Sequence, residues 1–554
     1  MLRTGWRLLA RGDIVGLSRR LGRRLGRWPD RPVPIDYCSW RTEHVDLAPA
    51  HRTAMASMLN TLSRIPSFTI ICTGAPATPT TRQVRDEFVP DVRFVYDDNP
   101  VPDRMALEPE RWFIHLPAEA QLHQAALAFL AIYLAYSSKV LVVYTDNDHL
   151  DDEGLHVNPY FKPDWNSDLL LAQPYLGPLV AVRGDHLARV LARGFWTSAH
   201  DQQLRYTDGL QADQIGHLPR VLATEPLNGL PFADPTAVSG HLAGQGVQAE
   251  VSRAGRACRV HWPVPDPPPL VSILIPTRDQ ARLLSRCLAG LYDRTSYPAV
   301  EVIIIDHESR QRRARREINT ARARSDTVVL DHSGPFNFAS MMNRAAEVAS
   351  GDVLCLLNND TEVLHQDWLT ELVGHACRPG VGAVGALLLF SDGTVQHAGV
   401  HPGLDGLMGH GHKHSAGDDP GYFDRLRSAH DVAAVTGACL VTTRAVWDQL
   451  GGLDEDGLAV AYNDVDYCLR ARSAGLRVVL TPHARLRHHE SVSRGFDDPS
   501  RSARLERELE VMRSRWGDYL MVDPAYNPNL SLNGHGFVPT RRPRIPRIPK
   551  PGGP

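Results

Sequence analysis

The chain has 554 residues, which exceeds the roughly 250–300 residues at which one hydrophobic core stops growing, so two or more domains are expected. A net charge of -3 at pH 7 excludes nucleic acid as a partner of the whole chain, and any basic binding feature must be local. None of the 8 cysteines forms a CxxC pair, and no apolar stretch reaches the roughly 20 residues of a membrane span. Because no secretory signal is visible either, we expect a cytoplasmic protein.

The first residues, "MLRTGWRLLARGDIVGLSRRLGRRLGRW", form a basic, amphipathic arm. Apolar positions interleave with arginines, which is typical of a helix lying on an anionic membrane surface. An arginine-rich helix packed on its own protein would show the same pattern. Peripheral contact with the inner face of the cell membrane therefore stays open as an addition to the cytoplasmic location.

Proline-rich stretches suggest where the domains divide. The segment "HWPVPDPPPL" forbids regular helix and favours an extended linker, and the C-terminal "TRRPRIPRIPKPGGP" is basic and irregular. The predicted organisation is an arm (1–34), a first domain (35–258), a linker (259–269), a second domain (270–522) and an irregular basic tail (523–554).

Strand and helix alternate after the linker. "LVSILIPT" (270–277), "VEVIIID" (300–306) and the run 353–357 are predicted strands, and the residues 280–295 and 338–350 are predicted helices. This alternation predicts an α/β fold with a mostly parallel central sheet flanked by helices.

Each of these strands ends in polar residues. Thr277 and Asp279 follow the first strand, Asp306 ends the second, and Asn358, Asn359 and Asp360 follow the third. One polar strand end is an ordinary turn. Because ligands bind outside the carboxyl ends of strands in open α/β sheets, three such ends in one sheet predict a pocket.

Two later stretches carry candidate chemistry. In "YNDVDYCLRARSAG", Asp464 and Asp466 precede a helix, where a carboxylate suits either a base or a cap. In "RLRHHESVSRG", the adjacent His488 and His489 are candidate metal ligands.

Seven motifs occur together and in order: "VSILIPTRD", "VIIIDHES", "FNFASMMNRAAEVASGDVLCLLNNDTEV", "GVGAVGALLLFSDGTVQHAGV", "VAAVTGACLVTTRAVWDQLGGLDE", "AYNDVDYCLR" and "HHESVSRG". The set resembles glycosyltransferase family 2, in particular bacterial, rhamnosyltransferase-like members that build O-antigen and other surface polysaccharides. The resemblance covers about residues 268–500 and implies two GT-A-like domains in this chain. It also implies transfer of a sugar, with inversion, from a nucleotide-diphosphate donor to a glycan or lipid-linked saccharide acceptor.

The resemblance implies a metal site for Mg²⁺ or Mn²⁺. A departing diphosphate is anionic, and a divalent cation neutralises it. Asp360 matches the carboxylate of the metal motif and His488 the second protein ligand, with His489 as the fallback. The first position of the motif is Asn358 rather than an acid, which lowers the charge that faces the metal.

The remaining roles also follow from the resemblance. Asp464 matches the base that takes the proton of the acceptor hydroxyl, and Asp466 would support the helix or the acceptor. The residues assigned to donor binding are Asp306 at the nucleoside, Asn343 toward the pyrophosphate, and Thr277, Asp279, Asn358 and Asn359 around them. "MGHGHKH" (408–414) is either a metal cluster or a loop on the acceptor side.

The first half resembles a degenerate copy of the same domain. "WFIHLPAEAQL" (112–122) aligns with the strand that should end in the metal motif, yet it reads Pro117, Ala118 and Glu119 there. In "HDQQLRYTD", Asp201 aligns with the base and Gln203 replaces the second acid. We expect a domain retained for packing or acceptor binding. A second active site using Glu119 and Asp201 is the alternative, and a non-catalytic scaffold that binds glycan or a partner is the competing class for the whole chain.

Overall fold

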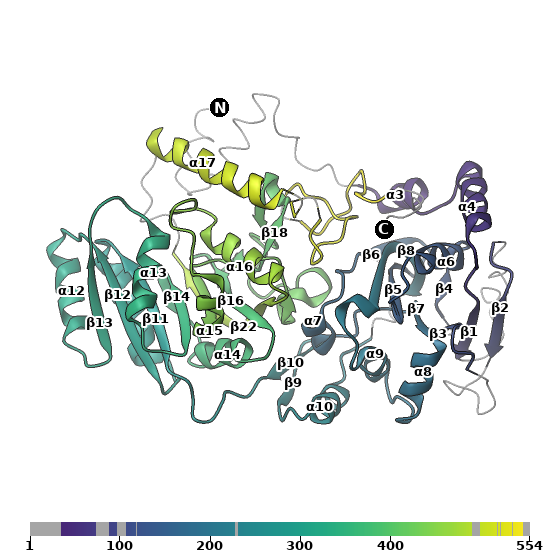
Figure 1. The fold of residues 1–554 in the computed structure, drawn as a ribbon, viewed down its shortest axis with the longest axis horizontal. Coiled ribbons are helices and arrows are strands. Elements are labelled where there is room, and N and C mark those ends of the chain that lie inside the picture. Colours follow the sequence, from purple (N-terminus) through teal and green to yellow (C-terminus); the bar gives the residue numbers. More distant parts are fainter. Residues whose placement is uncertain are drawn as a thin grey trace. The chain divides into compact units, whose positions relative to one another are not determined.

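The computed structural model describes residues 35–73, 88–96, 107–117, 119–227, 231–489, 499–517, 519–520, 522–534 and 536–546. The basic arm (1–34), Ala118 and the last eight residues of the tail lie outside the described residues. The described chain forms two compact units (Figure 1). The N-terminal unit comprises residues 35–260, 524–531 and 538–546, and the C-terminal unit comprises residues 261–523 and 532–537. The predicted domain boundaries stay a prediction.

A ten-stranded mixed sheet forms the centre of the C-terminal unit, in the order β13-β12-β11-β14-β21-β16-β22-β15, with β17 on β16 and β20 on β22. Its strands are β11 (Val271–Thr277), β12 (Val300–His307), β13 (Thr327–His332), β14 (Val353–Leu357), β15 (Thr361–Val363), β16 (Val381–Leu389), β17 (Val395–His397), β20 (His430–Asp431), β21 (Cys439–Thr443) and β22 (Arg477–His488). Parallel ladders join β13, β12, β11 and β14, and β16 to β22, whereas β21 is antiparallel to both its neighbours.

Helices cover both faces of this sheet, because side chains of buried strands alternate between two apolar cores. Leu274, Ile303 and Leu354 belong to one core, while Ile273 and Ile304 belong to the other. The helices of the first core are α13 (Phe338–Val348), α15 (Arg444–Leu450), α16 (Asn463–Ser473) and α17 (Pro499–Trp516); those of the second are α11 (Ala281–Arg294), α12 (Arg312–Arg322) and α14 (Trp368–Ala376). The α/β class predicted from the sequence is confirmed.

A small excursion leaves the sheet between β17 and β20. It consists of β18 (Val400–Pro402), the 3-10 helix η3 (Leu404–Gly406), β19 (Met408–His410) and the 3-10 helix η4 (Tyr422–Arg427). Strands β18 and β19 form an antiparallel pair.

The N-terminal unit has an eight-stranded sheet in the order β2-β1-β3-β7-β5-β8-β4, with β6 on β5. The strands are β1 (Phe68–Thr73), β2 (Val92–Tyr96), β3 (Trp112–Pro117), β4 (Gln121–Leu122), β5 (Val142–Leu150), β6 (His156–Tyr160), β7 (Val180–Arg183) and β8 (Ile215–Pro226). The helices are α3 (Tyr37–His44), α4 (Pro49–Thr61), α6 (Ala126–Ala135), α7 (Ser167–Ala172), α8 (Gly184–Leu191), α9 (Ala199–Thr207), η1 (Ala212–Gln214) and α10 (Pro235–Gly244), followed by the pair β9 (Glu250–Ala254) and β10 (Ala257–His261). Helix α6 is strongly apolar, and most of its residues are buried.

The two sheets repeat one strand order. Each strand of the N-terminal sheet has a counterpart in the C-terminal sheet with the same neighbours and the same direction of pairing. The counterparts are β1 and β11, β2 and β12, β3 and β14, β7 and β21, β5 and β16, β8 and β22, β4 and β15, and β6 and β17. The N-terminal unit is therefore a second copy of the fold, which gives a direct way to compare equivalent positions.

A C-terminal segment completes the N-terminal unit. The carboxylate of Asp146 on β5 is fully buried and accepts hydrogen bonds from the side-chain amides of Asn527, at 3.1 and 2.9 Å, and Asn529, at 3.2 Å. His217 on β8 lies 3.0 Å from the same carboxylate. Because a buried carboxylate needs hydrogen-bond donors, these residues fix the segment in the unit.

Candidate active site

Contacts in the C-terminal unit join the polar strand ends. Thr277 and Asp306 are register partners at the ends of β11 and β12. Nδ2 of Asn359 donates to Oγ1 of Thr277 at 2.9 Å, and the backbone N–H of Asn358 donates to the carbonyl of Ala438 at 3.1 Å. The carboxyl ends of β11, β12 and β14 and the loop before β21 therefore meet at one edge of the sheet.

Several loops near this edge hold residues other than glycine in the left-handed region. φ is 57° at Asp279 and 52° at Gln280 after β11, 54° at Glu308 after β12, and 63° at Tyr462 before α16. This conformation is costly for residues with a Cβ and concentrates at functional sites. The strain gives a second, independent reason to look for function here.

Asp360 and His488 face one another at the tip of β14. Their side chains come together because β15, directly after Asp360, pairs with the end of β22, where Thr361 is opposite His488. Oδ1 of Asp360 and Nε2 of His488 are 3.0 Å apart, and the residues are only 4% and 9% exposed. Two neighbouring ligands on an octahedral ion with bonds of about 2.1 Å lie about this far apart. The pair thus fits a divalent cation that takes one oxygen and one imidazole from the protein.

Gln396 on β17 orients the imidazole. Its Oε1 accepts a hydrogen bond from Nδ1 of His488 at 2.7 Å, and the residue is 5% exposed. When the imidazole is neutral, a proton on Nδ1 leaves the lone pair on Nε2, which faces Asp360. Nδ2 of Asn358 lies 3.2 Å from the same Nε2. Sequence reasoning missed Gln396, although it lies within one of the recognised motifs.

The next histidine points elsewhere. Nε2 of His489 is 3.0 Å from Glu362 and 2.9 Å from Arg286, and its Nδ1 is 2.8 Å from Oγ of Ser391. Consecutive side chains at a strand end project to opposite faces, so only His488 reaches the carboxylate of Asp360. His488, predicted to be the metal ligand, therefore lies against Asp360, whereas His489, predicted as the fallback, lies against Glu362, Arg286 and Ser391.

Asp464 lies in the first turn of α16, beside the loop that contacts Asn358. Oδ2 accepts from the backbone N–H of Gly437 at 2.7 Å, and Oδ1 accepts from its neighbour Val465 at 2.8 Å. Burial raises the pKa of Asp464 and outweighs these two backbone hydrogen bonds, which lower it. A carboxylate with a raised pKa is a stronger base, which suits a proton acceptor.

Asp466 is anchored within the protein. Its fully buried carboxylate pairs with Arg470 at 2.8 Å and Arg515 at 2.7 Å, and accepts from the indole N–H of Trp516 at 3.0 Å. These contacts fasten α16 to α17. Of the two predicted alternatives, they favour support of the helix over contact with an acceptor.

Three residues assigned to the donor have local partners as well. Oδ1 of Asp279 accepts from the backbone N–H groups of Arg310 and Gln311 at 2.7 Å, before α12. Oδ1 of Asp306 accepts from the N–H of Ser309 at 3.0 Å and is only half-buried, so the other oxygen is free for a ligand group. Asn343 bonds in both directions with the backbone of Leu453, away from the strand tips. Their donor contacts stay a prediction.

The histidine-rich loop does not gather its imidazoles around one point. Nδ1 of His410 pairs with Nδ1 of His397 at 2.8 Å, whereas His412 accepts from the N–H of Tyr422 and stacks on Phe537 at 4.1 Å between ring centroids. Burial lowers the pKa of His412 well below its usual range, so its ring is neutral. Among the described residues, no group of three or more His, Cys, Asp or Glu side chains could hold a metal ion.

The N-terminal unit differs at the equivalent positions. In the C-terminal unit Asp464, in the first turn of α16, accepts from the N–H of Gly437 in the loop before β21. In the N-terminal unit the equivalent loop before β7 contacts a residue in the middle of α9 instead, where Oε1 of Gln203 accepts from the N–H of Leu176 at 3.0 Å. Asp201, predicted from the sequence to be the counterpart of the base, instead pairs with Arg205 at 2.7 Å. The pair Asp201–Arg205, four residues apart, repeats the pair Asp466–Arg470 of the C-terminal unit, so Asp201 has the environment of Asp466 and not that of the base. Glu119 is exposed.

Comparison with known proteins gives this site its class. Residues 267–509 match the family model described as "Glycosyltransferase like family 2". This part of the chain thus matches the family that its motifs predicted, and the C-terminal unit has the GT-A-like fold. The repeated strand order gives the N-terminal unit the same architecture.

The chain is also similar to longer bacterial proteins. It is 39% identical over 417 residues to the uncharacterized protein y4gI of Sinorhizobium fredii (72% of this chain, 46% of the relative). It is 38% identical over 442 residues to the O-antigen biosynthesis protein RfbC of Myxococcus xanthus (75% of this chain, 33% of the relative). The chain thus spans less than half the length of these relatives. A solved mannosyltransferase, PcManGT from Pyrobaculum calidifontis, is 18% identical with a TM-score of 0.32, over 47% of this chain and 75% of that one.

Within the described residues, no helix is both long and apolar enough to cross a membrane.

Proposed function

We propose that the chain is a metal-dependent glycosyltransferase that moves a sugar from a nucleotide-diphosphate donor to a hydroxyl of a glycan or lipid-linked saccharide in bacterial surface polysaccharide synthesis. The observation that carries the proposal is the Asp360–His488 pair, joined through Asn358 and Ala438 to the loop that holds Asp464, within the family 2 segment. The similarity to the O-antigen biosynthesis protein RfbC supports the polysaccharide context.

The proposed reaction is a single inverting displacement. The acceptor oxygen bonds to the anomeric carbon as the bond from that carbon to the diphosphate oxygen breaks, and the nucleotide diphosphate leaves on the opposite face. Asp464 receives the proton of the attacking hydroxyl, and its raised pKa favours that transfer. Asp306 and Thr277 at the ends of β12 and β11 receive the nucleoside side of the donor.

Asp360 and His488 are the residues that would hold a Mg²⁺ or Mn²⁺ ion. A bound cation would neutralise the charge that develops on the leaving diphosphate. The residues themselves supply the orientation: Gln396 holds the imidazole, and β15 holds the carboxylate opposite it. Asn358 adds a neutral amide where a second carboxylate would add charge.

A panel of dTDP-, UDP- and GDP-sugars with Mn²⁺ tests the proposal by thermal shift and by donor hydrolysis. We expect one nucleotide class to raise the unfolding temperature in a Mn²⁺-dependent way, because a ligand that binds the native state stabilises it. No shift with any donor, together with no hydrolysis and no transfer, would favour the alternative of a non-catalytic scaffold that binds glycan or a partner.

The second alternative is a bifunctional transferase with an active site in each unit. The contacts of Asp201 argue against it: its carboxylate pairs with Arg205 at 2.7 Å and accepts from the N–H of Thr197 at 2.9 Å, so both oxygens already have donors. The N-terminal unit is better suited to packing or to binding an acceptor.

Peripheral membrane contact is a further part of the proposal and depends on residues 1–28 alone. Their deletion should release the protein from anionic liposomes while donor binding is retained. Unchanged co-sedimentation would assign the arm to packing within the protein instead.

A further inference from the structure

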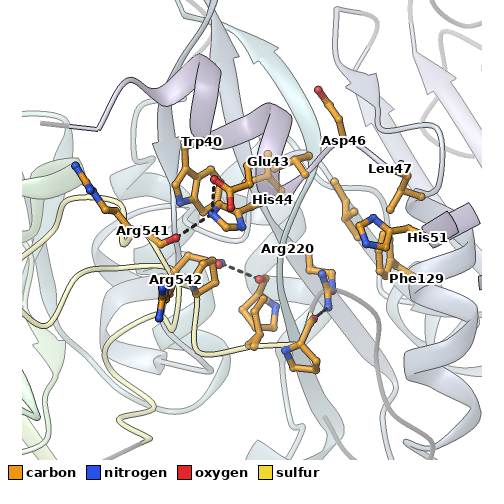
Figure 2. A pocket seen from close by; sticks show the side chains of 18 residues that line it. Trp40, Glu43, His44, Asp46, Leu47, His51, Phe129, Arg220, Arg541 and Arg542 are labelled. Carbon is orange, nitrogen blue, oxygen red and sulfur yellow. Dashed lines mark hydrogen bonds and ion pairs between the residues drawn. The ribbon is translucent and has the colours of Figure 1, made fainter. Parts of the chain in front are cut away.

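The N-terminal unit contains a cavity of about 310 Å³ at a distance in sequence from every residue of the candidate active site. Figure 2 shows its walls: Trp40 and His44 from α3, Arg541 and Arg542 from the C-terminal segment, and Arg220 from β8. The volume lies at the lower end of the range of about 300–1,000 Å³ that small-molecule sites occupy.

A bulge in β8 projects Arg220 into this cavity. Thr145 of β5 pairs with Leu218 and the next residue, Asp146, pairs with Val221, so Arg220 lies in the extra length of β8 between them. A bulged residue leaves the ladder and can point its side chain away from the sheet. Bulges of this kind are common where a strand must direct a side chain at a site.

The guanidinium of Arg220 is held in place without a counter-charge. It lies 4.5 Å from the centroid of the Phe129 ring and donates one hydrogen bond to the carbonyl of Pro546. Within the described part of the chain, no carboxylate forms an ion pair with it. Burial lowers the pKa of Arg220 to about 10, so it stays charged at neutral pH although part of its hydration is lost. A desolvated charge of this kind is stabilised by an anion.

The other charges around the cavity leave an excess of positive charge. Arg541 and Arg542 are exposed, and no ion pair joins either side chain to another described residue. Asp46 is already paired with Arg41 at 2.7 Å, and Glu43 lies 3.9 Å from His44. Three arginines therefore line a cavity whose two acids have basic neighbours of their own.

The rest of the lining is apolar. Val45, Leu47, Leu222, Pro543 and Ile545 line the cavity together with Phe129. We propose that the cavity binds a phosphate or diphosphate group carried by an amphiphilic molecule: the arginines receive the anion and the apolar side chains receive the adjoining hydrocarbon. Arginine forks match phosphate oxygens in charge and in geometry. The site is independent of the proposed transferase reaction, because it shares no residue with it.

Calorimetric titration of the full chain in EDTA tests this proposal, since chelation removes any metal-dependent donor binding. The probes are inorganic diphosphate, farnesyl diphosphate and UDP. We expect farnesyl diphosphate to bind more tightly than inorganic diphosphate, which identifies a lipid phosphate as the source. UDP binding as tightly as farnesyl diphosphate would overturn the amphiphilic carrier and identify a free phosphate compound as the ligand instead.

Three variants separate the anion site from general effects. Arg220→Met keeps the packing on Phe129 and should weaken binding by about tenfold or more, as loss of a charge-assisted hydrogen bond does. Arg220→Lys should fall between it and the wild type. Arg378→Met, which removes a guanidinium stacked 4.2 Å from the Trp262 centroid in the other unit, is the matched control and should change binding less than about twofold.

If Arg220→Met fails to fold, the exposed double variant Arg541→Ser/Arg542→Ser tests the same proposal and should also weaken binding. The proposal is overturned if no probe binds the wild type at millimolar concentration. It is equally overturned if folded Arg220→Met, or the double variant, binds farnesyl diphosphate as tightly as Arg378→Met does.

Discussion

Nδ1 of His488 and Oε1 of Gln396 lie 2.7 Å apart, and this hydrogen bond joins residues 92 positions apart in the chain. An amide oxygen only accepts, so Nδ1 carries a proton, and in the neutral imidazole the lone pair is on Nε2. The direction of that lone pair, toward Asp360, is thus set by a residue that does not touch the proposed metal.

Gln396→Leu should weaken Mn²⁺ binding about 10- to 100-fold, because the imidazole loses the acceptor that fixes its ring and its tautomer. Gln396→Glu should restore binding or strengthen it, since a carboxylate accepts the same proton and makes the ring more basic. Titration of Mn²⁺ without donor measures both. Gln366→Leu, at an exposed position, is the control; equal affinity of Gln396→Leu and this control would remove Gln396 from the site.

Asp464→Asn should lower the transfer rate by about 100-fold or more while donor affinity changes little, because only the proton acceptor is lost. Donor titration and initial rates, measured on the same preparation, distinguish the two effects. A variant that transfers sugar at the normal rate would show that another group takes the proton.

The pH dependence of the transfer rate should follow the ionisation of Asp464. The pKa of Asp464 is raised by burial, and the carboxylate accepts a proton only when it is ionised. Transfer should therefore decline on the acid side at a pH above the ordinary value of an aspartate, with a slope of one proton. Rates measured from pH 4 to 8 check this; an acid limb at the ordinary aspartate value or below would contradict it.

One metal-dependent donor site per chain is expected. Asp360→Ala should abolish Mn²⁺-dependent donor binding, whereas Glu119→Ala combined with Asp201→Ala should leave affinity and stoichiometry unchanged, because neither residue has the environment of its counterpart. Calorimetry with donor and Mn²⁺ gives the stoichiometry. Two equivalent sites that fall to one in the double variant would show that both units are active.

Stability of the N-terminal unit should decrease above neutral pH. Burial lowers the pKa of His217, but hydrogen bonds with Asp146 and Asp164, together with their charges, outweigh it and raise the pKa to about 9. The pKa of His217 in the folded protein exceeds the unfolded value of 6.5. Its contribution to the free energy of unfolding is therefore complete below about pH 6.5 and is lost as pH rises through 9. The loss amounts to about 3 kcal/mol. Calorimetric unfolding from pH 6 to 10 measures it, and the decrease between pH 6.5 and 9 should be smaller by about this amount in His217→Gln. An unchanged decrease in this variant would contradict the assignment.

The sequence predicted what depends on residues close together in the chain. Strand–helix alternation after residue 270 gave the α/β class, and ordered motifs gave the family and placed Asp360, His488 and Asp464. Features that depend on distant pairing were missed. Gln396 becomes informative only when the hydrogen bond from β17 to His488 at the end of β22 is known, and the match of Asp201 to Asp466 only when their ion pairs with Arg205 and Arg470 are known.

The cavity was missed for a related physical reason. Arg220 points into it because β8 carries more residues than β5 between two matched pairs, and a sequence does not show the register of two strands. The opposite wall comes from residues 541–546, which read as an irregular basic tail. Proline-rich composition forbids helix but says nothing about which surface the segment lies on.

The hydrogen bonds that Asn527 and Asn529 donate to Asp146 have a consequence for biosynthesis. These amides follow the carboxylate by 381 and 383 positions, so the buried charge acquires them only after that length of chain has left the ribosome. Domains usually fold in the order in which they are translated. Here the unit that is translated first is completed only after most of the second unit has been translated, because residues 524–531 follow that unit in the chain. Until then Asp146 is without these two donors, and we expect the N-terminal unit to be prone to aggregation during that interval.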